Sequence, residues 1–173
     1  IVKMDISHAS PNCFEQMSKP DVLIHLAWDG LPNYKSLHHF ETELPKHYHF
    51  LKMMIEAGLP SLLVTGTCFE YGMQPGSLAP DLITEPANSY AFAKDTLRKQ
   101  LEFLRIFTPF NLTWARLFYM YGDGQPITSL YPMLKDAVSR REKVFNMSGG
   151  EQLRDYLRVE DVADEIVRLA VEK

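Results

Sequence analysis

Three short apolar runs, separated by longer segments with helical periodicity, constrain the fold of this chain most strongly. The run at residues 22–27 is continuous in apolar side chains, which is typical of a strand buried on both faces, and we predict further strands at residues 61–65 and 111–118. Between them, residues 34–57 and 90–107 carry apolar residues at helical spacing. Strands that alternate with helices predict βα units, a parallel sheet and helices on both of its faces. We therefore expect an α/β fold, a doubly wound parallel sheet of the Rossmann type.

The remaining elements follow from weaker signals. Gly58 ends the long helix of residues 34–57, with Pro60 just beyond, and the internal Pro45 predicts that this helix is kinked or restarted. The other predicted elements are a strand at residues 1–6, a helix at 11–18, a helix at 130–141, a strand at 143–147 and a helix from residue 159.

Composition excludes several classes of function. The chain has 173 residues, a net charge of −4 and no run of Lys or Arg, so we predict no nucleic-acid partner. Its apolar runs are too short to span a membrane, and we predict no membrane partner. Cys13 and Cys68 form neither a disulfide framework nor a zinc motif. These features together favour a cytoplasmic protein.

Four histidines gather in the first long helix, at positions 38, 39, 47 and 49. We interpret them as residues of a solvated helix, because we find among them no carboxylate pair with the i, i+4 spacing of metal ligands. The sequence analysis therefore predicts no metal site.

Tyr90 and Lys94 stand four residues apart at the start of the second long helix. Side chains at i and i+4 share a helix face, and a nearby ammonium lowers the pKa of a phenol from its ordinary value of about 10. Tyr90 is thus a candidate proton donor and acceptor. Thr67 follows the strand of residues 61–65, and ligands of parallel sheets bind at the carboxyl ends of strands. We expect Thr67, Tyr90 and Lys94 to converge on one crevice.

Several motifs in order give the chain a family resemblance. It resembles the extended short-chain dehydrogenase/reductase family, the NAD-dependent epimerases and dehydratases that modify sugar nucleotides. The resemblance rests on these segments: Val2-Lys3-Met4-Asp5-Ile6, Asp21 to Ala27, Thr65-Gly66-Thr67-Cys68-Phe69-Glu70-Tyr71-Gly72, Tyr90 with Lys94, Arg116 to Tyr121, and Arg154-Asp155-Tyr156 with Val159 to Ala163.

The resemblance implies a role for each candidate residue. Catalysis would use Thr67, Tyr90 and Lys94, with Tyr90 exchanging a proton with a sugar oxygen while nicotinamide exchanges the hydride. The cofactor would be NAD or NADP. Residues expected to contact it are Asp5, Ile6, Leu26, Ala27, Trp28, Thr65, Tyr90, Lys94 and Phe118. Residues expected to contact a nucleotide-sugar substrate are Cys68, Phe69, Tyr119 and Arg154, whose guanidinium suits a diphosphate.

Plainer interpretations stand beside these roles. Thr67 could be only a strand-end cap, Asp5 a turn residue, and Arg154 part of a surface ion pair with Asp155 or Asp161. Cys68 fits a packing role better than a nucleophile, because no histidine base lies beside it in the sequence.

The sequence also departs from the family pattern. The 4,6-dehydratases carry Asp-Glu after the active-site threonine, whereas this chain has Cys68 and Phe69, and the frequent Asn of the family is Tyr119 here. These departures favour a reductase or an epimerase over a dehydratase. The Gly-rich loop that binds the pyrophosphate is not in this sequence, so we expect the chain to be part of a longer protein rather than a remnant.

The overall hypothesis is 4-keto reduction or epimerisation of a nucleotide-activated hexose or deoxyhexose. We predict a partial dinucleotide-binding domain at residues 1–126, a substrate-lobe segment at 127–158 and a returning helix at 159–173. The resemblance further implies a homodimer through the helices Tyr34–Ala57 and Tyr90–Phe107. Two alternatives stay open: a non-catalytic cofactor-binding scaffold or sensor, which the missing loop favours, and a reductase of a non-sugar ketone, in which Arg154 would hold no diphosphate.

Overall fold

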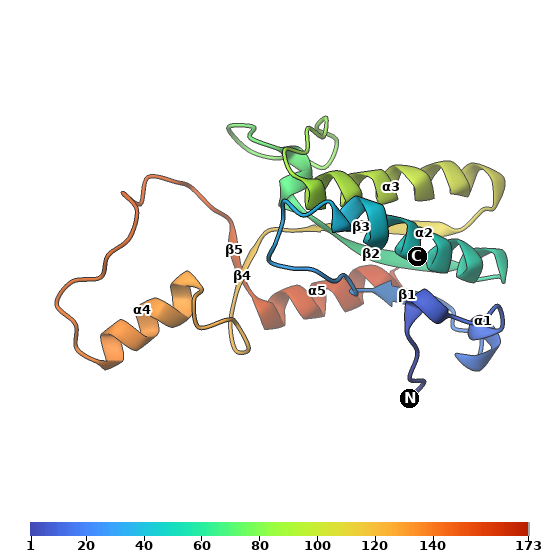
Figure 1. The fold of residues 1–173 in the computed structure, drawn as a ribbon, viewed down its shortest axis with the longest axis horizontal. Helices are drawn as coiled ribbons and strands as arrows, with labels where there is room; N and C mark the ends of the chain where they lie inside the picture. The colour runs from blue at the N-terminus through green and yellow to red at the C-terminus, as the bar shows by residue number, and fades with distance from the viewer. Residues whose placement is uncertain (173) are drawn as a thin grey trace. The chain divides into compact units, whose positions relative to one another are not determined.

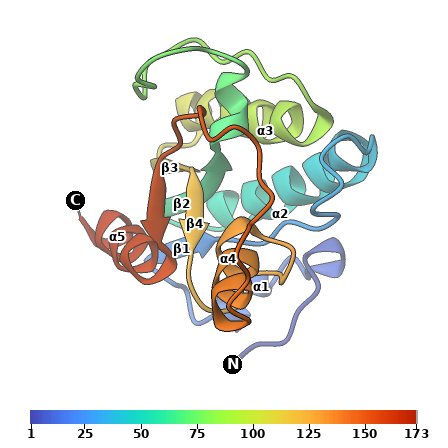
Figure 2. The same cartoon turned by 90° about the vertical axis from the view of Figure 1, so that its left-hand side faces the viewer.

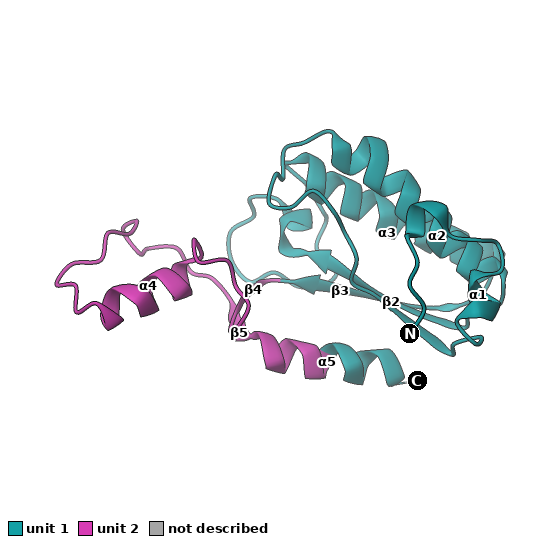
Figure 3. Cartoon of the chain, turned by 60° about the horizontal axis from the view of Figure 1, so that its bottom comes forward, with its two compact units in different colours: residues 1–117, 166–173 teal, residues 118–165 magenta. Residues whose placement is uncertain are grey.

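The computed structural model describes residues 1–172 and divides into two compact units. The first unit comprises residues 1–117 together with the end of the last helix from Ile166, and the second comprises Phe118–Glu165 (Figure 3). The domain boundaries predicted after residues 126 and 158 stay a prediction. Lys173, the last residue of the predicted returning helix, lies outside the described residues.

A parallel sheet forms the centre of the first unit. Its strands are β1 (Val22–His25), β2 (Ser61–Thr67) and β3 (Asn111–Leu117), in the order β1-β2-β3. Val22 pairs with Ser61, and Ser61 pairs with Asn111, so the three strands start level with one another. The central strand β2 is buried along almost its whole length, as the continuous apolar pattern predicts.

Two helices pack side by side on one face of this sheet, and the end of α5 lies on the other face (Figures 1 and 2). The pair is α2 (Leu44–Glu56) and α3 (Ser89–Phe107), and α5 spans Val159–Val171. Both helices bury residues at helical spacing, among them Leu51, Met54, Leu97 and Leu101. The predicted doubly wound α/β architecture is confirmed, with βα units linked in chain order β1-α2-β2-α3-β3.

The long helix before β2 begins differently from the prediction. A π-helical segment, His39–Glu43, precedes α2, and Pro45 lies in the first turn of α2, where its missing N–H costs no helical hydrogen bond. Gly58, with φ of +110°, ends α2 as predicted. The prediction that Pro45 restarts the helix is confirmed, and the predicted start at residue 34 is too early.

Short elements complete the two units. The first unit also contains a 3₁₀ helix at Ile6–His8, the helix α1 (Cys13–Gln16) and a 3₁₀ helix, η3, at Cys68–Tyr71. The second unit contains a two-stranded parallel ladder of β4 (Tyr119–Tyr121) and β5 (Tyr156–Arg158), and the helix α4 (Leu130–Ser139).

Two predicted strands, residues 1–6 and 143–147, are absent from the described part of the chain. A strand exists only as part of a ladder, and the described ladders pair β1 with β2, β2 with β3, and β4 with β5. The two strand predictions are therefore wrong, because an apolar pattern alone does not supply a partner strand. None of the helices described over residues 1–172 is long and apolar enough to cross a membrane.

Candidate active site

Tyr90 and Lys94 lie in the first turns of α3, on the face that packs against the sheet. Asn88 caps this helix by accepting a hydrogen bond from the backbone N–H of Ala91, at 2.9 Å. Tyr90 is 8% exposed and Lys94 is 2% exposed. The predicted i, i+4 pair is therefore present and buried, rather than on a solvated helix face.

Thr67 ends β2 and is buried beside Tyr90. The Thr67 side chain interacts with the Tyr90 phenol and acts to lower its pKa, which favours the phenolate. The Thr67 hydroxyl also accepts a hydrogen bond from the backbone N–H of Phe69, at 3.3 Å, and so caps η3. Thr67 is thus both a strand-end cap and a neighbour of the candidate proton donor.

Burial shifts the pKa values of both members of the pair away from the charged forms. Burial is the main cause that raises the pKa of Tyr90 to about 12, with smaller contributions from Tyr34, Glu70 and Cys68. Burial likewise lowers the pKa of Lys94 to about 8, and the charge of Glu70 opposes that shift. The predicted lowering of the Tyr90 pKa is wrong in this structure, because desolvation of the phenolate outweighs the favourable groups around it.

Trp28 lies against both residues of the pair, just past the end of β1. The Lys94 ammonium is 4.5 Å from the centre of the indole ring, and the Tyr90 ring meets the indole edge-on at 6.0 Å. The indole N–H donates to Nδ1 of His39 at 3.1 Å. Leu26 and Ala27, predicted to contact the cofactor, precede Trp28 and are exposed.

A chain of buried side chains lies behind Trp28. The indole stacks on the His47 ring at 4.6 Å. Nε2 of His47 lies 3.0 Å from Glu43, and Nε2 of His25 lies 2.9 Å from Nδ1 of His47. Burial is the main cause that lowers the pKa of His25 to about 3 and that of His47 to about 4. Because a carboxylate only accepts hydrogen bonds, neutral His47 donates to Glu43 and accepts from His25.

The interpretation of the histidines as part of a solvated helix is wrong for two of them. His39 and His47 are buried, and the interpretation overlooked that Glu43 and His47 form an i, i+4 pair with a carboxylate. The periodicity of the core explains the burial of His47, because His47 precedes Leu51 and Met54 on the inward face of α2.

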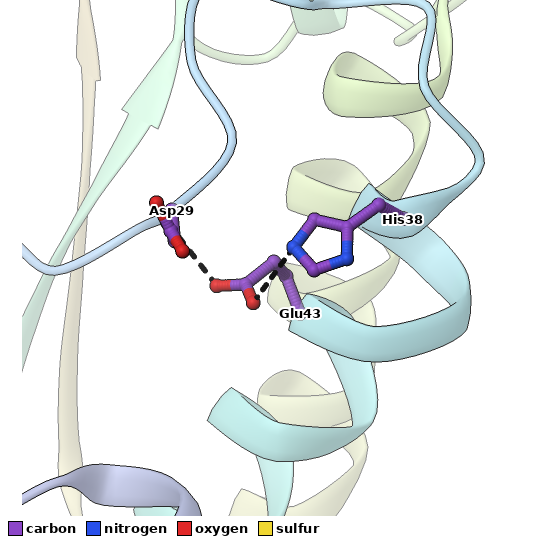
Figure 4. Close-up of side chains that lie close together, drawn as sticks. All are labelled: Asp29, His38 and Glu43. Atoms are coloured by element: carbon purple, nitrogen blue, oxygen red, sulfur yellow. Dashed lines mark hydrogen bonds and ion pairs between the residues drawn. The ribbon is translucent and has the colours of Figure 1, made fainter.

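Asp29, His38 and Glu43 form a group whose ligand atoms all lie within 4.8 Å of one another and which could hold a metal ion (Figure 4). The Glu43 carboxylate already accepts hydrogen bonds from Lys46, from His47 and from the backbone N–H of Asp29. We therefore interpret the group as a hydrogen-bonded cluster, and the absence of a metal site stays a prediction.

Glu70 is a site residue that the sequence analysis missed. Its carboxylate is fully buried and accepts hydrogen bonds from the Thr67 backbone, from Trp114 and from Arg116. The signal in the sequence was the spacing Thr67-x-x-Glu70, which is that of a helix capping box.

The other predicted residues of the first unit lie in three places. Thr65 is buried in β2, and its hydroxyl donates to the backbone oxygen of His25 at 3.4 Å. Cys68 and Phe69 begin η3, and the Phe69 ring packs edge-on against Tyr34 at 5.2 Å. Asp5 and Ile6 lie at the start of the first 3₁₀ helix, in the N-terminal segment, which lies away from the start of α3 (Figures 1 and 2). The Asp5 carboxylate caps the first 3₁₀ helix by accepting from Ser7, as the turn interpretation predicts.

The second unit brings two predicted substrate residues together. The Arg154 guanidinium lies 4.4 Å from the centre of the Tyr119 ring and donates to the Gln152 side chain at 2.6 Å. Phe118 is the first residue of this unit and is partly buried. A cavity of about 510 Å³ lies within the unit, lined by Tyr119, Met120, Tyr121, Gln125, Ser129, Leu130, Tyr131, Leu134 and Tyr156.

Known proteins include relatives of this chain. The chain is 30% identical over 154 residues to the dTDP-6-deoxy-L-talose 4-dehydrogenase (NAD(+)) of Aggregatibacter actinomycetemcomitans, covering 88% of this chain and 57% of that protein. It is 27% identical to the GDP-6-deoxy-D-talose 4-dehydrogenase of the same organism, covering 89% of this chain and 53% of that protein. The chain thus spans about half the length of these relatives.

The fold has solved counterparts. The UDP-glucuronic acid 4-epimerase from Bacillus cereus, solved with UDP-glucuronic acid and NAD, superposes with a TM-score of 0.76 at 19% identity, covering 98% of this chain and 55% of that one. The sequence profile of the NAD-dependent epimerase/dehydratase family matches residues 1–173. The chain belongs to the NAD-dependent epimerase/dehydratase family.

Proposed function

We propose that this chain carries the catalytic residues of an NAD-dependent enzyme that acts at carbon 4 of a nucleotide-activated hexose or deoxyhexose, by 4-keto reduction or epimerisation. The observation that supports this proposal most directly is the burial of Thr67, Tyr90 and Lys94, with the Thr67 side chain interacting with the Tyr90 phenol at the carboxyl end of β2. Two relatives named as 4-dehydrogenases of deoxysugar nucleotides support the choice of carbon and of substrate class.

The residues around Tyr90 suit a nicotinamide cofactor. Lys94 offers ammonium donors that ribose hydroxyls can accept, and Trp28 offers an aromatic surface beside it. When bound, the nicotinamide ring supplies or accepts the hydride. We choose NAD over NADP because the family is NAD-dependent and the more similar of the two relatives is named for NAD.

Each catalytic residue has a task in this proposal. Tyr90 gives a proton to the sugar oxygen during reduction and takes it back during oxidation. Thr67 donates to the same oxygen and fixes its distance from the phenol. Lys94 binds the ribose, and its positive charge favours the phenolate once substrate and cofactor exclude water from the site. The raised pKa of Tyr90, about 12, keeps the phenol protonated and ready to act as the acid in the reduction direction.

Replacement of Tyr90 by Phe tests the proposal. We expect turnover of a nucleotide-4-ketosugar by the full-length protein, followed through NADH absorbance, to fall by at least about 10²-fold, which is the size of a general acid–base contribution. Tyr48→Phe removes the same atom from a partly buried tyrosine of α2 and should keep full activity. Unchanged turnover in Tyr90→Phe would contradict the proposal.

Arg154 separates nucleotide sugars from other ketones. We propose that its guanidinium, held on the Tyr119 ring, binds the substrate diphosphate. Arg154→Ala should raise the KM for a nucleotide sugar about tenfold or more, the value of a hydrogen bond to a charged group. Arg140→Ala, which breaks exposed ion pairs on α4, is the matched control and should leave KM unchanged. Equal KM values in both variants would contradict a role of Arg154 in binding the diphosphate.

We also propose that the surface of α2 and α3 binds a second copy of the chain. Phe103 and Phe107 are exposed on α3, and a groove of about 390 Å³ lies between them and Tyr48 of α2. The Gln100 side-chain oxygen is buried in this region without a partner among the described residues. Phe103→Glu should convert a dimer of the full-length protein into a monomer in sedimentation experiments, and a wild-type monomer would exclude this interface.

A further inference from the structure

Glu70 is a fully buried carboxylate that contacts the backbone of Thr67. The Thr67 backbone N–H donates to Oε1 of Glu70 at 2.9 Å, while the Thr67 hydroxyl accepts from the Phe69 backbone at 3.3 Å. Together these two hydrogen bonds form a capping box. Because they fix the backbone of Thr67, they also fix the direction in which its side chain points.

Side chains from β3 hold the Glu70 carboxylate in place. Arg116 donates from Nε to Oε2 of Glu70 at 2.7 Å, and Trp114 donates from its indole N–H at 3.0 Å. The same guanidinium also donates to the Tyr71 hydroxyl at 3.1 Å and to the Pro80 backbone oxygen at 3.0 Å. We call Glu70, Trp114 and Arg116 the Glu70 cluster. It connects β3, η3 and the loop after η3 to the backbone N–H of Thr67.

Gly66 permits the Trp114 and Glu70 side chains to lie close to the backbone of β2. A Cβ atom at Gly66 would lie 2.2 Å from Nε1 of Trp114 and 2.5 Å from Oε1 of Glu70, which is far closer than real Cβ contacts. The glycine next to Thr67 is thus required by the Glu70 cluster, independently of its own backbone angles.

A capping box does not by itself need a buried ion pair. An exposed glutamate satisfies the same backbone N–H, and a buried ion pair adds little net stability, because both charges lose their hydration. What burial adds is a single fixed geometry at the end of β2. We propose that Glu70 is a positioning residue for catalysis, which acts through Arg116 and Trp114 to hold the Thr67 hydroxyl against Tyr90. This inference rests on the proposed function of Thr67.

Two substitutions of Glu70 in the full-length protein test the inference. Glu70→Ala removes every contact, and we expect kcat to fall about 10²-fold with little change in KM, since a displacement of about 1 Å in a reacting group costs that much. Glu70→Gln keeps an acceptor for the Thr67 N–H and loses the charge, so its kcat should lie between those of Glu70→Ala and the wild type.

Asp95 provides the matched control. It is 2% exposed, lies on α3 one residue from Lys94, and is held by Arg98 at 2.8 Å, Lys99 at 2.6 Å and Thr84 at 3.0 Å. Asp95→Asn therefore weakens the ion pairs of a second buried carboxylate, with Arg98 and Lys99, and neither pair contacts Thr67. We expect its kcat to stay within about twofold of the wild type. An equal loss of kcat in Asp95→Asn, or a normal kcat in Glu70→Ala, would overturn the inference.

Amide hydrogen exchange separates this inference from the proposed function. The Thr67 N–H should exchange faster in Glu70→Ala than in Asp95→Asn, whether or not a substrate is turned over. Equal exchange rates would show that Glu70 does not hold Thr67. Protected exchange in an enzyme that turns over no nucleotide ketosugar would instead count against the proposed function.

Discussion

Two buried carboxylates near Tyr90 and Lys94 contrast in their surroundings. Glu43 and Glu70 are 1% and 0% exposed. Glu43 contacts Lys46 and His38, whose side chains are 18% and 39% exposed, together with neutral His47. Glu70 contacts Arg116, which is only 11% exposed. The partners of the first carboxylate are thus more exposed to solvent than the Arg116 side chain that pairs with the second.

The pKa values of the two carboxyl groups respond in opposite directions. Burial raises the pKa of Glu43, but hydrogen bonds from Lys46, the Asp29 backbone and His47 outweigh it, and the net pKa is lowered. Burial of Glu70 outweighs Arg116 and the Thr67 N–H, and the net pKa is raised. The number of partners is similar on the two sides. The sign therefore depends on whether the desolvation of the carboxylate or its hydrogen bonds and ion pairs contribute more.

The largest expected effect compares Glu70→Ala with Glu43→Ala. Removal of Glu70 leaves the Arg116 charge nearly enclosed, so we expect unfolding free energy to drop by about 3–5 kcal/mol. Removal of Glu43 leaves Lys46 free to turn to water, so we expect a smaller loss of about 1–3 kcal/mol. Urea denaturation at pH 7 gives both values, and the reverse order would contradict the comparison.

Replacement of both partners of the Glu70–Arg116 ion pair sharpens the comparison. Glu70→Leu with Arg116→Met removes both charges, so the double variant should recover roughly half of the stability lost in Glu70→Leu alone. Turnover should stay low, because the Thr67 N–H still lacks its acceptor. Urea denaturation and kcat are measured on the same preparations. Recovery of kcat together with stability would show that the ion pair serves stability alone.

Much of the fold could be predicted from the sequence, because short apolar runs mark the strands and helical periodicity marks the helices. These elements are β1, β2, β3, α2, α3 and α5. The failures have a common cause. Residues 1–6 and 143–147 have apolar patterns but no partner strand in the described ladders, whereas the three-residue β5 is too short to show a pattern. Pairing between strands is a tertiary property that periodicity does not contain.

The candidate site was predictable only in part. Thr67, Tyr90 and Lys94 were found by family motifs and by an i, i+4 spacing. The hydrogen bonds that surround them join residues far apart in the sequence: Glu70 to Arg116 spans 46 positions, and His25 to His47 spans 22. Local spacing cannot predict such contacts. Two local signals were nevertheless present, the capping box at Thr67 and the Glu43–His47 pair.

The loss of stability at acidic pH should come from the two buried histidines near Glu43, His25 and His47. His25 and His47 have folded pKa values of about 3 and about 4, below the ordinary value of 6.5, so the unfolded chain binds more protons at mildly acidic pH. Stability should therefore be lost as pH falls below about 6.5, by about 2 kcal/mol for each imidazole at pH 5.

His47→Gln isolates this effect. It removes one titrating imidazole, so urea denaturation between pH 7 and pH 5 should show a shallower decline than in the wild type. The window lies above the ordinary carboxyl value of 4.5, where Glu43 with its lowered pKa stays ionised in the native protein. An unchanged slope in His47→Gln would show that other groups cause the decline.

The smallest expected effect compares two tryptophans, Trp28 near the Glu43 site and Trp114 at the Glu70 site. The Trp28 indole N–H donates to neutral His39 at 3.1 Å, whereas the Trp114 indole N–H donates to Glu70 at 3.0 Å. A hydrogen bond to a charged group contributes about 1.5–3 kcal/mol, and one between neutral groups about 0.5–1.5 kcal/mol. Phe replaces either indole with a similar ring, so Trp114→Phe should lower stability more than Trp28→Phe. Equal losses in urea denaturation would contradict the comparison, because the bond to the Glu70 carboxylate would then contribute no more than the bond to His39.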